Sequence, residues 1–364
     1  MMRSASSRDF FRLLPKSDLH VHLRGAMPKD TFLHQWRKYP HIATSFPSDI
    51  RRMMAGFDNL RGLLESSARL DPDALFAYRS FDQFLATWVF TRFFFRDKDD
   101  LDRLMDGVVK DLAKAGVHYA EITIAVSEYT AMGITMEDIL ASMEQTARTA
   151  PFHMAWIVDL IRDVGPAAAM KTLEELLTIG CDSWIGITIG GSEHHHPPGQ
   201  FVNVYDRARD AGLHLTAHAG EACGPDSVRD ALEILGIERI GHGVRAIEEP
   251  ALVELLAHRG VPLEVCPSSN ISTGIYESIS THPIGALHDA GVKVTVNSDD
   301  PTFFATDIAT EFTRLLAAGL PLSSLRSIAR NGFVYAFAEQ HTKTRLLERF
   351  DTEWERLAKL YCMA

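Results

Sequence analysis

The 364-residue sequence contains only four cysteines, and no two of them have the C-x-x-C spacing of a redox or zinc-knuckle motif. Scattered single cysteines do not form the frame of a disulfide-rich secreted domain, so we expect reduced thiols. No stretch reaches the roughly 18 apolar residues that a membrane-spanning helix needs. The first 14 residues include three arginines but no apolar core of signal-peptide length. These absences together predict a cytoplasmic protein.

The sequence also lacks a basic run. Lysine and arginine number 37 against 48 acidic residues, which gives a formal net charge of -11. Nucleic acids and anionic membranes both require a basic surface, so the charge argues against either as a partner. A hydrophobic content of 46% is ordinary for a globular protein with a full core. No linker, repeat or low-complexity segment divides the chain, and we expect one domain over residues 1–364; nothing indicates an oligomeric state.

Short apolar segments recur at regular intervals and alternate with helical patterns. The expected strands are 17–25, 118–126, 153–160, 184–189, 213–219, 239–243, 261–266 and 292–297. Helical periodicity occupies the segments between them, and several of these end in a glycine that suits a left-handed helix cap. Eight such units predict a closed parallel (β/α)8 barrel. A long helical block over about 27–116 is interpreted as an insertion after the first strand, and residues 301–364 as terminal helices.

Chemically active side chains gather where the expected strands end. In a (β/α)8 barrel the carboxyl ends of all strands meet at one mouth, and catalytic groups lie there. His20 and His22 are spaced i, i+2 and therefore point to the same side of the first strand. His218 lies at the end of the fifth expected strand, and Asp299 follows the eighth. Three histidines and one carboxylate suit a zinc ion that keeps a position for water, so this set predicts a hydrolase.

Three further polar residues lie beside these expected ligands. Glu221 follows His218 by three residues and fits a general acid or proton shuttle. His242 stands between two glycines and fits a base or an orienting group for water. Asp300 points away from its neighbour Asp299 and is better placed to hydrogen-bond a substrate. All three are therefore candidate catalytic residues.

These motifs, taken jointly, resemble the adenosine deaminase family of the amidohydrolase-type metal-dependent barrels. The matching segments, in the family's order, are LPKSDLHVHL (14–23), HAGE (218–221), RIGHG (239–243), EVCPSSN (264–270) and NSDDP (297–301). The resemblance implies hydrolytic removal of the 6-amino group of an adenine ring, as in adenosine, with ammonia as second product. The partner it implies is a small purine nucleoside.

The same resemblance implies roles for individual residues. One zinc ion per chain would be held by His20, His22, His218 and Asp299. Glu221 would protonate purine N1, His242 would assist the attacking hydroxide, Asp300 would contact N7, and the backbone of Gly191 would lie beside N3. Burial beside other acids would keep Glu221 protonated at neutral pH.

Two positions depart from the family's pattern. Arg24 stands where adenosine deaminases usually carry an aspartate near the ribose 5'-hydroxyl. A planar cation suits carboxylate or phosphate, and one hypothesis is therefore that the substrate is an adenosine with an anion at or beyond the 5' position, such as aminodeoxyfutalosine or a nucleotide. The alternative is that Arg24 pairs with an acid of the helical insertion. Thr188 replaces a second aspartate, which puts a supporting role at that position in doubt.

Other interpretations stay open beside the enzyme. A catalytically idle family member could act as a binding protein, although every expected ligand is retained together with Glu221 and His242. A two-metal hydrolase would need a bridging group at the end of the fourth strand, where 187–190 offers none. The tract 194–196 consists of three consecutive histidines, which cannot converge on one metal without strain, and is expected to be a mobile loop. Cys223 has no evident basic partner and is interpreted as pocket wall.

Overall fold

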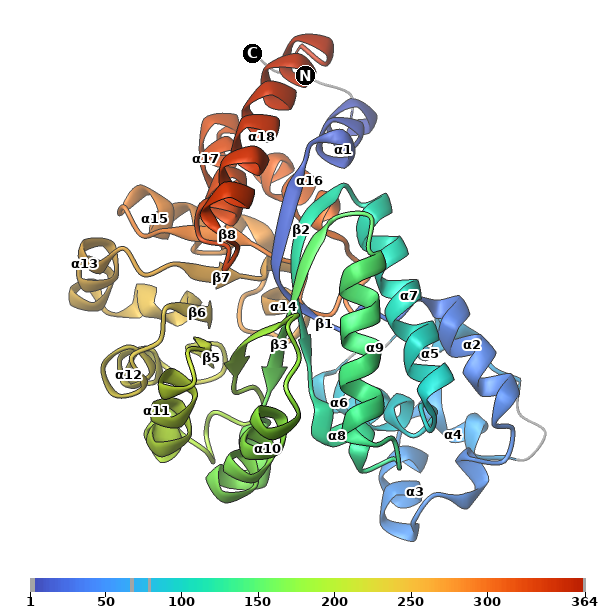
Figure 1. Ribbon diagram of the computed structural model, residues 1–364. Coiled ribbons are helices and arrows are strands. Elements are labelled where there is room, and N and C mark those ends of the chain that lie inside the picture. The colour runs from blue at the N-terminus through green and yellow to red at the C-terminus, as the bar shows by residue number, and fades with distance from the viewer. Residues whose placement is uncertain (1–3, 66–68, 78–79, 363–364) are drawn as a thin grey trace.

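The centre of the molecule is a sheet of eight parallel strands in chain order, as the computed structural model shows (Figure 1). The structure describes residues 4–65, 69–77 and 80–362. The strands are β1 (Lys16–His22), β2 (Val117–Ile124), β3 (His153–Asp159), β4 (Trp184–Thr188), β5 (His214–Ala219), β6 (Arg239–His242), β7 (Leu263–Val265) and β8 (Val294–Val296). All eight lie within or close to the predicted segments.

The sheet closes between its last and first strands. The backbone N–H of His22 donates to the carbonyl of Asp299, and the N–H of Asp299 donates to the carbonyl of His20, both at 2.9 Å. Val21 and Asp299 form the corresponding parallel bridge. With no free edge left, the sheet is a barrel, and the predicted (β/α)8 class is confirmed.

Helices alternate with the strands around the outside of this barrel. They are α9 (Met136–Thr149), α10 (Gly165–Ile179), α11 (Val202–Asp210), α12 (Pro225–Asp230), α13 (Pro250–Arg259) and α15 (Ile284–Asp289), with short helices α8 (Val126–Thr130) and α14 (Pro267–Ser272) directly after β2 and β7. The predicted glycine caps are left-handed. At Gly116 (φ 81°) a Cβ would lie 2.3 Å from the carbonyl of Arg12, so only glycine fits.

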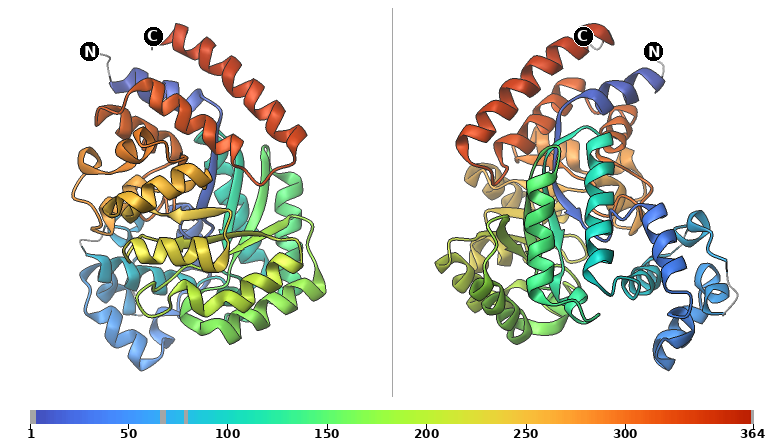
Figure 2. Two further views of the ribbon diagram at one scale, coloured as in Figure 1. Left: turned by 90° about the vertical axis from the view of Figure 1, so that its left-hand side faces the viewer. Right: turned by 45° about the vertical axis from the view of Figure 1, so that its right-hand side comes forward.

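The segment between β1 and β2 is helical, as predicted, and no strand interrupts its described residues. Its helices are α2 (Lys29–Lys38), α3 (Ser48–Ala55), α4 (Asp58–Arg61), α5 (Pro72–Leu75), α6 (Phe81–Arg92) and α7 (Lys98–Lys114). Figure 2 shows α2 to α6 standing beside one end of the barrel. Trp88 of α6 makes a ring contact with His22 at the end of β1, so this segment reaches the barrel mouth.

The opposite end of the barrel is covered by both ends of the chain (Figure 1). There α1 (Ser4–Leu13), which the sequence did not predict, packs with α16 (Ile308–Ala317) and α18 (Gln340–Leu360). Helix α17 (Leu322–Val334) in turn packs with α16 and α18. Phe10 meets Trp354 edge to face, with ring centroids 5.2 Å apart. Among the described helices, none combines the length and apolar composition needed to cross a membrane.

Candidate active site

Four predicted ligands converge at the carboxyl ends of β1, β5 and β8. The Nε2 atoms of His22 and His218 are 3.2 Å apart, and Asp299 Oδ1 lies 3.4 Å from His22 Nε2 and 3.6 Å from His20 Nε2. Donors held tetrahedrally at about 2.0–2.1 Å from zinc lie about 3.3–3.4 Å from one another. The spacing of these four side chains therefore fits one zinc-sized ion.

Two of the three histidines, His22 and His218, are held in the neutral form that binds metal. Burial lowers the pKa of His22 to about 4 and that of His218 well below its usual value. Burial also lowers the pKa of His20, but its hydrogen bond to Glu264 and the charge of Asp299 outweigh burial and leave that pKa raised. Asp299 stays ionised because nearby histidines lower its pKa against the effect of burial. Neutral imidazoles and an ionised carboxylate are what a divalent ion requires.

An unsatisfied buried atom supports the same assignment. Glu264 accepts a hydrogen bond from His20 Nδ1 at 2.8 Å, which fixes the tautomer and leaves His20 Nε2 buried without a hydrogen-bond partner. A buried polar atom without a partner is costly, and a metal ion would satisfy it. Among the described residues, His20, His22 and His218 form one of two groups whose side-chain atoms are close enough to share an ion.

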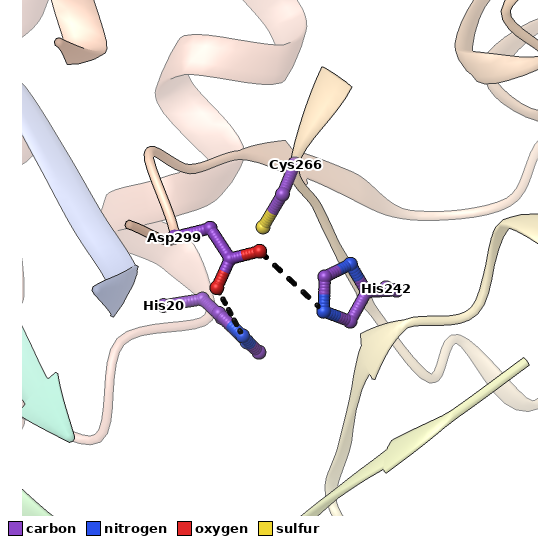
Figure 3. Close-up of side chains that lie close together, drawn as sticks. All are labelled: His20, His242, Cys266 and Asp299. Atoms are coloured by element: carbon purple, nitrogen blue, oxygen red, sulfur yellow. Dashed lines mark ion pairs between the residues drawn. The ribbon is translucent and has the colours of Figure 1, made fainter. Parts of the chain in front are cut away.

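The second such group contains His20, His242, Cys266 and Asp299 (Figure 3). Burial raises the pKa of the Cys266 thiol well above its usual value, and its Sγ faces the carbonyl of Glu264. Since thiols bind metal as thiolates, Cys266 is a poor ligand here. Figure 3 shows Asp299 between His20 and His242, with His242 Nε2 3.8 Å from Asp299 Oδ2.

Glu221 lies beside the expected metal position with its side chain 24% exposed. Loss of hydration, followed by the negative charges of Asp299 and Glu193, raises the pKa of Glu221 to about 8. A carboxyl group with this pKa carries a proton at neutral pH. Glu193, which the sequence reading gave no role, accepts hydrogen bonds from the backbone N–H groups of Glu221 and Cys223 at 3.1 and 2.8 Å and fixes this turn.

His242 stands opposite Glu221, with Nε2 3.6 Å from Glu221 Oε2. Burial lowers the pKa of His242 to about 4, so the ring is neutral. Its Nδ1 lies 3.3 Å from the side-chain amide of Asn270, whose Oδ1 is 3.1 Å from His282 Nε2. His242 and Asp299 both have φ 59°, a conformation uncommon outside glycine. Such backbone strain is typical of functional sites, where the surrounding structure fixes the direction of a side chain.

Asp300 is buried, and its Oδ1 has no hydrogen-bond partner among the described residues. Burial and the adjacent charge of Asp299 raise its pKa well above the usual value. The carboxyl lies without a partner for Oδ1 beside Gly25, where a Cβ would come within 1.7 Å of Oδ1, and its raised pKa favours the protonated form. A neutral acid in this position can bond to a ring nitrogen of a substrate.

Gly191 lies in the turn after β4 with φ 104°. A Cβ there would meet Asp163 Oδ2 at 1.9 Å, so the position requires glycine. Asp163 accepts the N–H of Ser192 at 2.9 Å, and Asp159 accepts the N–H of Gly190 at 2.8 Å. Sequence reasoning missed both aspartates, although Asp159 lies one residue before the end of the predicted strand 153–160, which was an available signal.

Arg24 does not present a free charge to the barrel mouth. Its Nη2 donates to both carboxylate oxygens of Glu128 at 2.7 and 2.8 Å, and Nη1 donates to the carbonyl of Trp88, whose ring lies 3.8 Å from the guanidinium carbon. Arg24 is 3% exposed. An internal ion pair was the alternative reading, but the acid comes from α8 after β2 and not from the expected insertion.

Three other features singled out from the sequence are Thr188, the histidine tract 194–196 and Cys223. Thr188 Oγ1 lies 3.3 Å from His218 Nδ1, so a hydroxyl contacts this expected ligand at the position where an aspartate is absent. None of the three histidines at 194–196 belongs to either possible metal group of the described residues. His194 Nδ1 lies 3.3 Å from Cys223 Sγ, so the expectation that Cys223 lacks a basic neighbour is wrong. Burial nevertheless raises the pKa of this thiol, which disfavours a nucleophile.

Several known proteins of similar sequence and structure are named deaminases. The family model described as adenosine deaminase matches residues 15–353. An adenine deaminase of Sinorhizobium medicae is 34% identical over 339 residues, covering 92% of this chain and 97% of that relative. An aminodeoxyfutalosine deaminase of Streptomyces coelicolor is 32% identical over 355 residues, covering 94% and 85%.

Two solved structures extend the comparison. The adenine deaminase of Arthrobacter aurescens has a TM-score of 0.82 and 25% identity, covering 94% of this chain and 99% of that one. An amidohydrolase of Burkholderia ambifaria, solved with bound Zn, has a TM-score of 0.80 and 25% identity, covering 100% and 97%. The overall fold is therefore shared over nearly the whole length of these proteins.

Proposed function

The chain belongs to the adenosine deaminase family, whose members hydrolyse the amidine C–N bond of purines, and from this premise we propose that it deaminates C6 of adenosine or an adenosine derivative with the help of zinc. The products are the inosine-type compound and ammonia. The observation that carries the proposal is the convergence of three histidines and Asp299 beside two carboxyl groups, Glu221 and Asp300, whose pKa values are raised.

Four residues would hold the metal: His20, His22, His218 and Asp299. A zinc ion bound there would lower the pKa of its water to near 7 and supply hydroxide at neutral pH. The orphaned His20 Nε2 and the 3.2 Å approach of His22 to His218 support this assignment. The zinc-containing relative of similar fold supports the identity of the ion, and we assign one ion per chain.

The protein's own acids and bases supply the proton movements. Glu221 donates its proton to N1, which makes C6 electrophilic, and His242 orients the attacking water through Nε2. The water oxygen adds to C6 while its proton passes to His242 Nε2, which transfers that proton to the amino group. The C6–N bond then breaks, ammonia leaves, and the proton of the new C6 hydroxyl returns to Glu221 as the carbonyl forms. Asp300 bonds to N7 and the Gly191 backbone lies beside N3. The raised pKa of Glu221 and the unpartnered Oδ1 of Asp300 support these roles.

The group attached to N9 is the least constrained part of the substrate. Arg24 is already neutralised by Glu128, so an anion at the 5' position would have to compete with an internal carboxylate. This favours an uncharged substrate, with adenosine first. Free adenine is the second candidate, because relatives 34% identical over most of the chain are named adenine deaminases.

A substrate panel tests these assignments. Zinc-loaded enzyme is mixed with adenosine, adenine, AMP and aminodeoxyfutalosine, and the absorbance change from adenine to hypoxanthine is followed. We expect the uncharged compounds to have the higher kcat/KM. The variant Glu128→Gln, which frees Arg24, should raise kcat/KM for AMP about tenfold, the value of one charge-assisted hydrogen bond.

Each possible result of the panel tests one of these assignments. Turnover of adenine alone would overturn the nucleoside assignment, and preference for an anionic compound by the unaltered enzyme would return Arg24 to the substrate site. No turnover of any adenine compound by protein that holds one zinc ion would overturn the proposed activity.

A further inference from the structure

A buried ionic network lies inside the barrel between the metal site and the C-terminal helices. It consists of Glu264 on β7, Arg239 on β6 and Glu121 on β2, whose side chains are 3%, 1% and 0% exposed. Barrel interiors are usually filled by layers of branched apolar side chains. Two carboxylates and a guanidinium in this layer therefore need an explanation.

Arg239 is the centre of this network. Its Nε donates to Glu264 Oε1 at 2.6 Å, and its Nη1 and Nη2 donate to the two oxygens of Glu121. Nη1 also donates to the carbonyl of Tyr335 at 2.8 Å, and the guanidinium carbon lies 3.6 Å from the ring centroid of Phe337. The planar fork thus holds two carboxylates from strands on different sides of the barrel, which lysine could not do.

Glu264 connects Arg239 to the metal site. Its Oε1 faces Arg239 and its Oε2 accepts from His20 Nδ1 at 2.8 Å. Both oxygens are therefore engaged in fixed directions, and the orientation of the His20 ring follows from them. That ring presents Nε2 to the expected ion. The direction of Nε2 therefore depends on Arg239 indirectly, through Glu264.

The far side of the network anchors it to the connection between α17 and α18. Glu121 Oε1 accepts the backbone N–H of Phe337 at 2.6 Å and the hydroxyl of Tyr119 at 3.0 Å. The ring of Phe337 stacks on that of His214, with centroids 4.0 Å apart and planes at 5°. The chain from His20 to Phe337 is thus continuous in hydrogen bonds across the barrel core.

Stability alone does not account for these charges. Buried ion pairs lose so much hydration that apolar replacements of similar volume are often neutral or stabilising. Partners behind a metal-binding histidine, in contrast, raise metal affinity by fixing the ring. We propose that Arg239, supported by Glu121, is a positioning residue that sets the metal affinity of His20 through Glu264.

The inference rests on the proposed metal centre. It is tested by measuring zinc binding and does not require a measurement of enzymatic activity. Zinc affinity of Arg239→Gln is measured by competition with a chromophoric chelator, and ligand geometry is followed by the visible spectrum of the cobalt-substituted protein. We expect zinc affinity to fall about 10–100-fold and the cobalt bands to change. Glu121→Gln, which keeps the side-chain size, should weaken zinc binding about threefold or more by the same route.

A matched control separates positioning from general destabilisation. Leu357→Ala removes a fully buried side chain of α18 that lies outside the network. It should lower the melting temperature and leave zinc affinity within about twofold of the unaltered protein, because no partner of His20 changes. If Arg239→Gln fails to fold, Glu121→Gln decides the question.

The outcomes separate the two proposals. Zinc affinity of the folded variants equal to that of the unaltered protein would overturn the positioning role while leaving the metal centre intact. Absence of stoichiometric zinc binding by the unaltered protein would overturn the metal centre itself, and this inference with it.

Discussion

Glu221 must carry a proton at neutral pH if it is to donate one to a ring nitrogen. Its pKa of about 8, raised by burial and by the charges of Asp299 and Glu193, meets this need. A group with a raised pKa is active below that value and loses its proton above it. We therefore expect kcat/KM to fall as pH rises through about 8, and Glu221→Gln to lose about 10²–10⁴-fold in kcat at neutral pH.

The control for this prediction is Cys223→Ser. Cys223 shares with Glu221 the hydrogen bonds to Glu193, but it has no role in proton transfer. Its kcat should stay within about fivefold of the unaltered enzyme, since an alcohol replaces a thiol of similar size. A Glu221→Gln enzyme with normal kcat, or an unchanged rate above pH 8, would contradict the assignment of Glu221 as the acid.

At the scale of single residues, the convergence of the four expected ligands was predictable from the sequence, whereas the hydrogen-bond partners behind them were not. His20 and His22 were found because a spacing of two on a strand puts both rings on one side. Their partners are set by tertiary contacts: Glu264 is 244 residues from His20, and Glu128 is 104 residues from Arg24. No local pattern encodes such pairs, so the reading of Arg24 as a free cation had no means of including Glu128.

Among the helices and strands, too, some were predictable from the sequence and others were not. The regular alternation of strands and helices was readable because each unit repeats the same apolar pattern and several end in glycine. Helices of five or six residues, such as α8 (Val126–Thr130) and α14 (Pro267–Ser272), are too short to show a helical period. Strands β7 and β8 have three residues each, shorter than predicted, although hydrogen bonds between neighbouring strands continue just outside them at Pro262, Lys293 and Asn297.

The junction between α1 and β1 contains a buried lysine that should make stability depend on pH. Lys16 Nζ donates to the carbonyl of Leu14 at 2.6 Å and to that of Phe11, and so ties the end of α1 to the barrel. Burial lowers its pKa to about 7, although Asp307 acts in the opposite direction. Between that value and the unfolded value of 10.5, the unfolded chain binds a proton that the folded protein does not.

Unfolding therefore takes up a proton over this range, and stability should rise with pH from 7 upwards. The slope contributed by one such group is at most about 1.4 kcal/mol per pH unit. Lys16→Met should flatten the pH dependence of the free energy of unfolding measured in urea, whereas Lys110→Met, which changes an exposed lysine of α7, should not. Equal slopes in all three proteins would show that Lys16 stays charged in the fold.

For the whole molecule, the expected metal connects parts of the barrel that are far apart in sequence. Its ligands come from β1, β5 and the residue that bridges β8 to β1, so one ion would join the closing seam to the opposite wall. Because the unfolded chain lacks this arrangement, binding stabilises only the folded state, by about 4 kcal/mol at a free zinc concentration 1,000 times Kd.

Chelation with 1,10-phenanthroline should lower the melting temperature by several degrees in a single transition, and added zinc should restore it. The isomer 1,7-phenanthroline, which cannot chelate, is the control for direct effects of the reagent. If mass spectrometry shows complete loss of metal while the calorimetric melting curve is unchanged, the four residues do not hold a stabilising ion, and the seam between β8 and β1 is closed by its backbone hydrogen bonds alone.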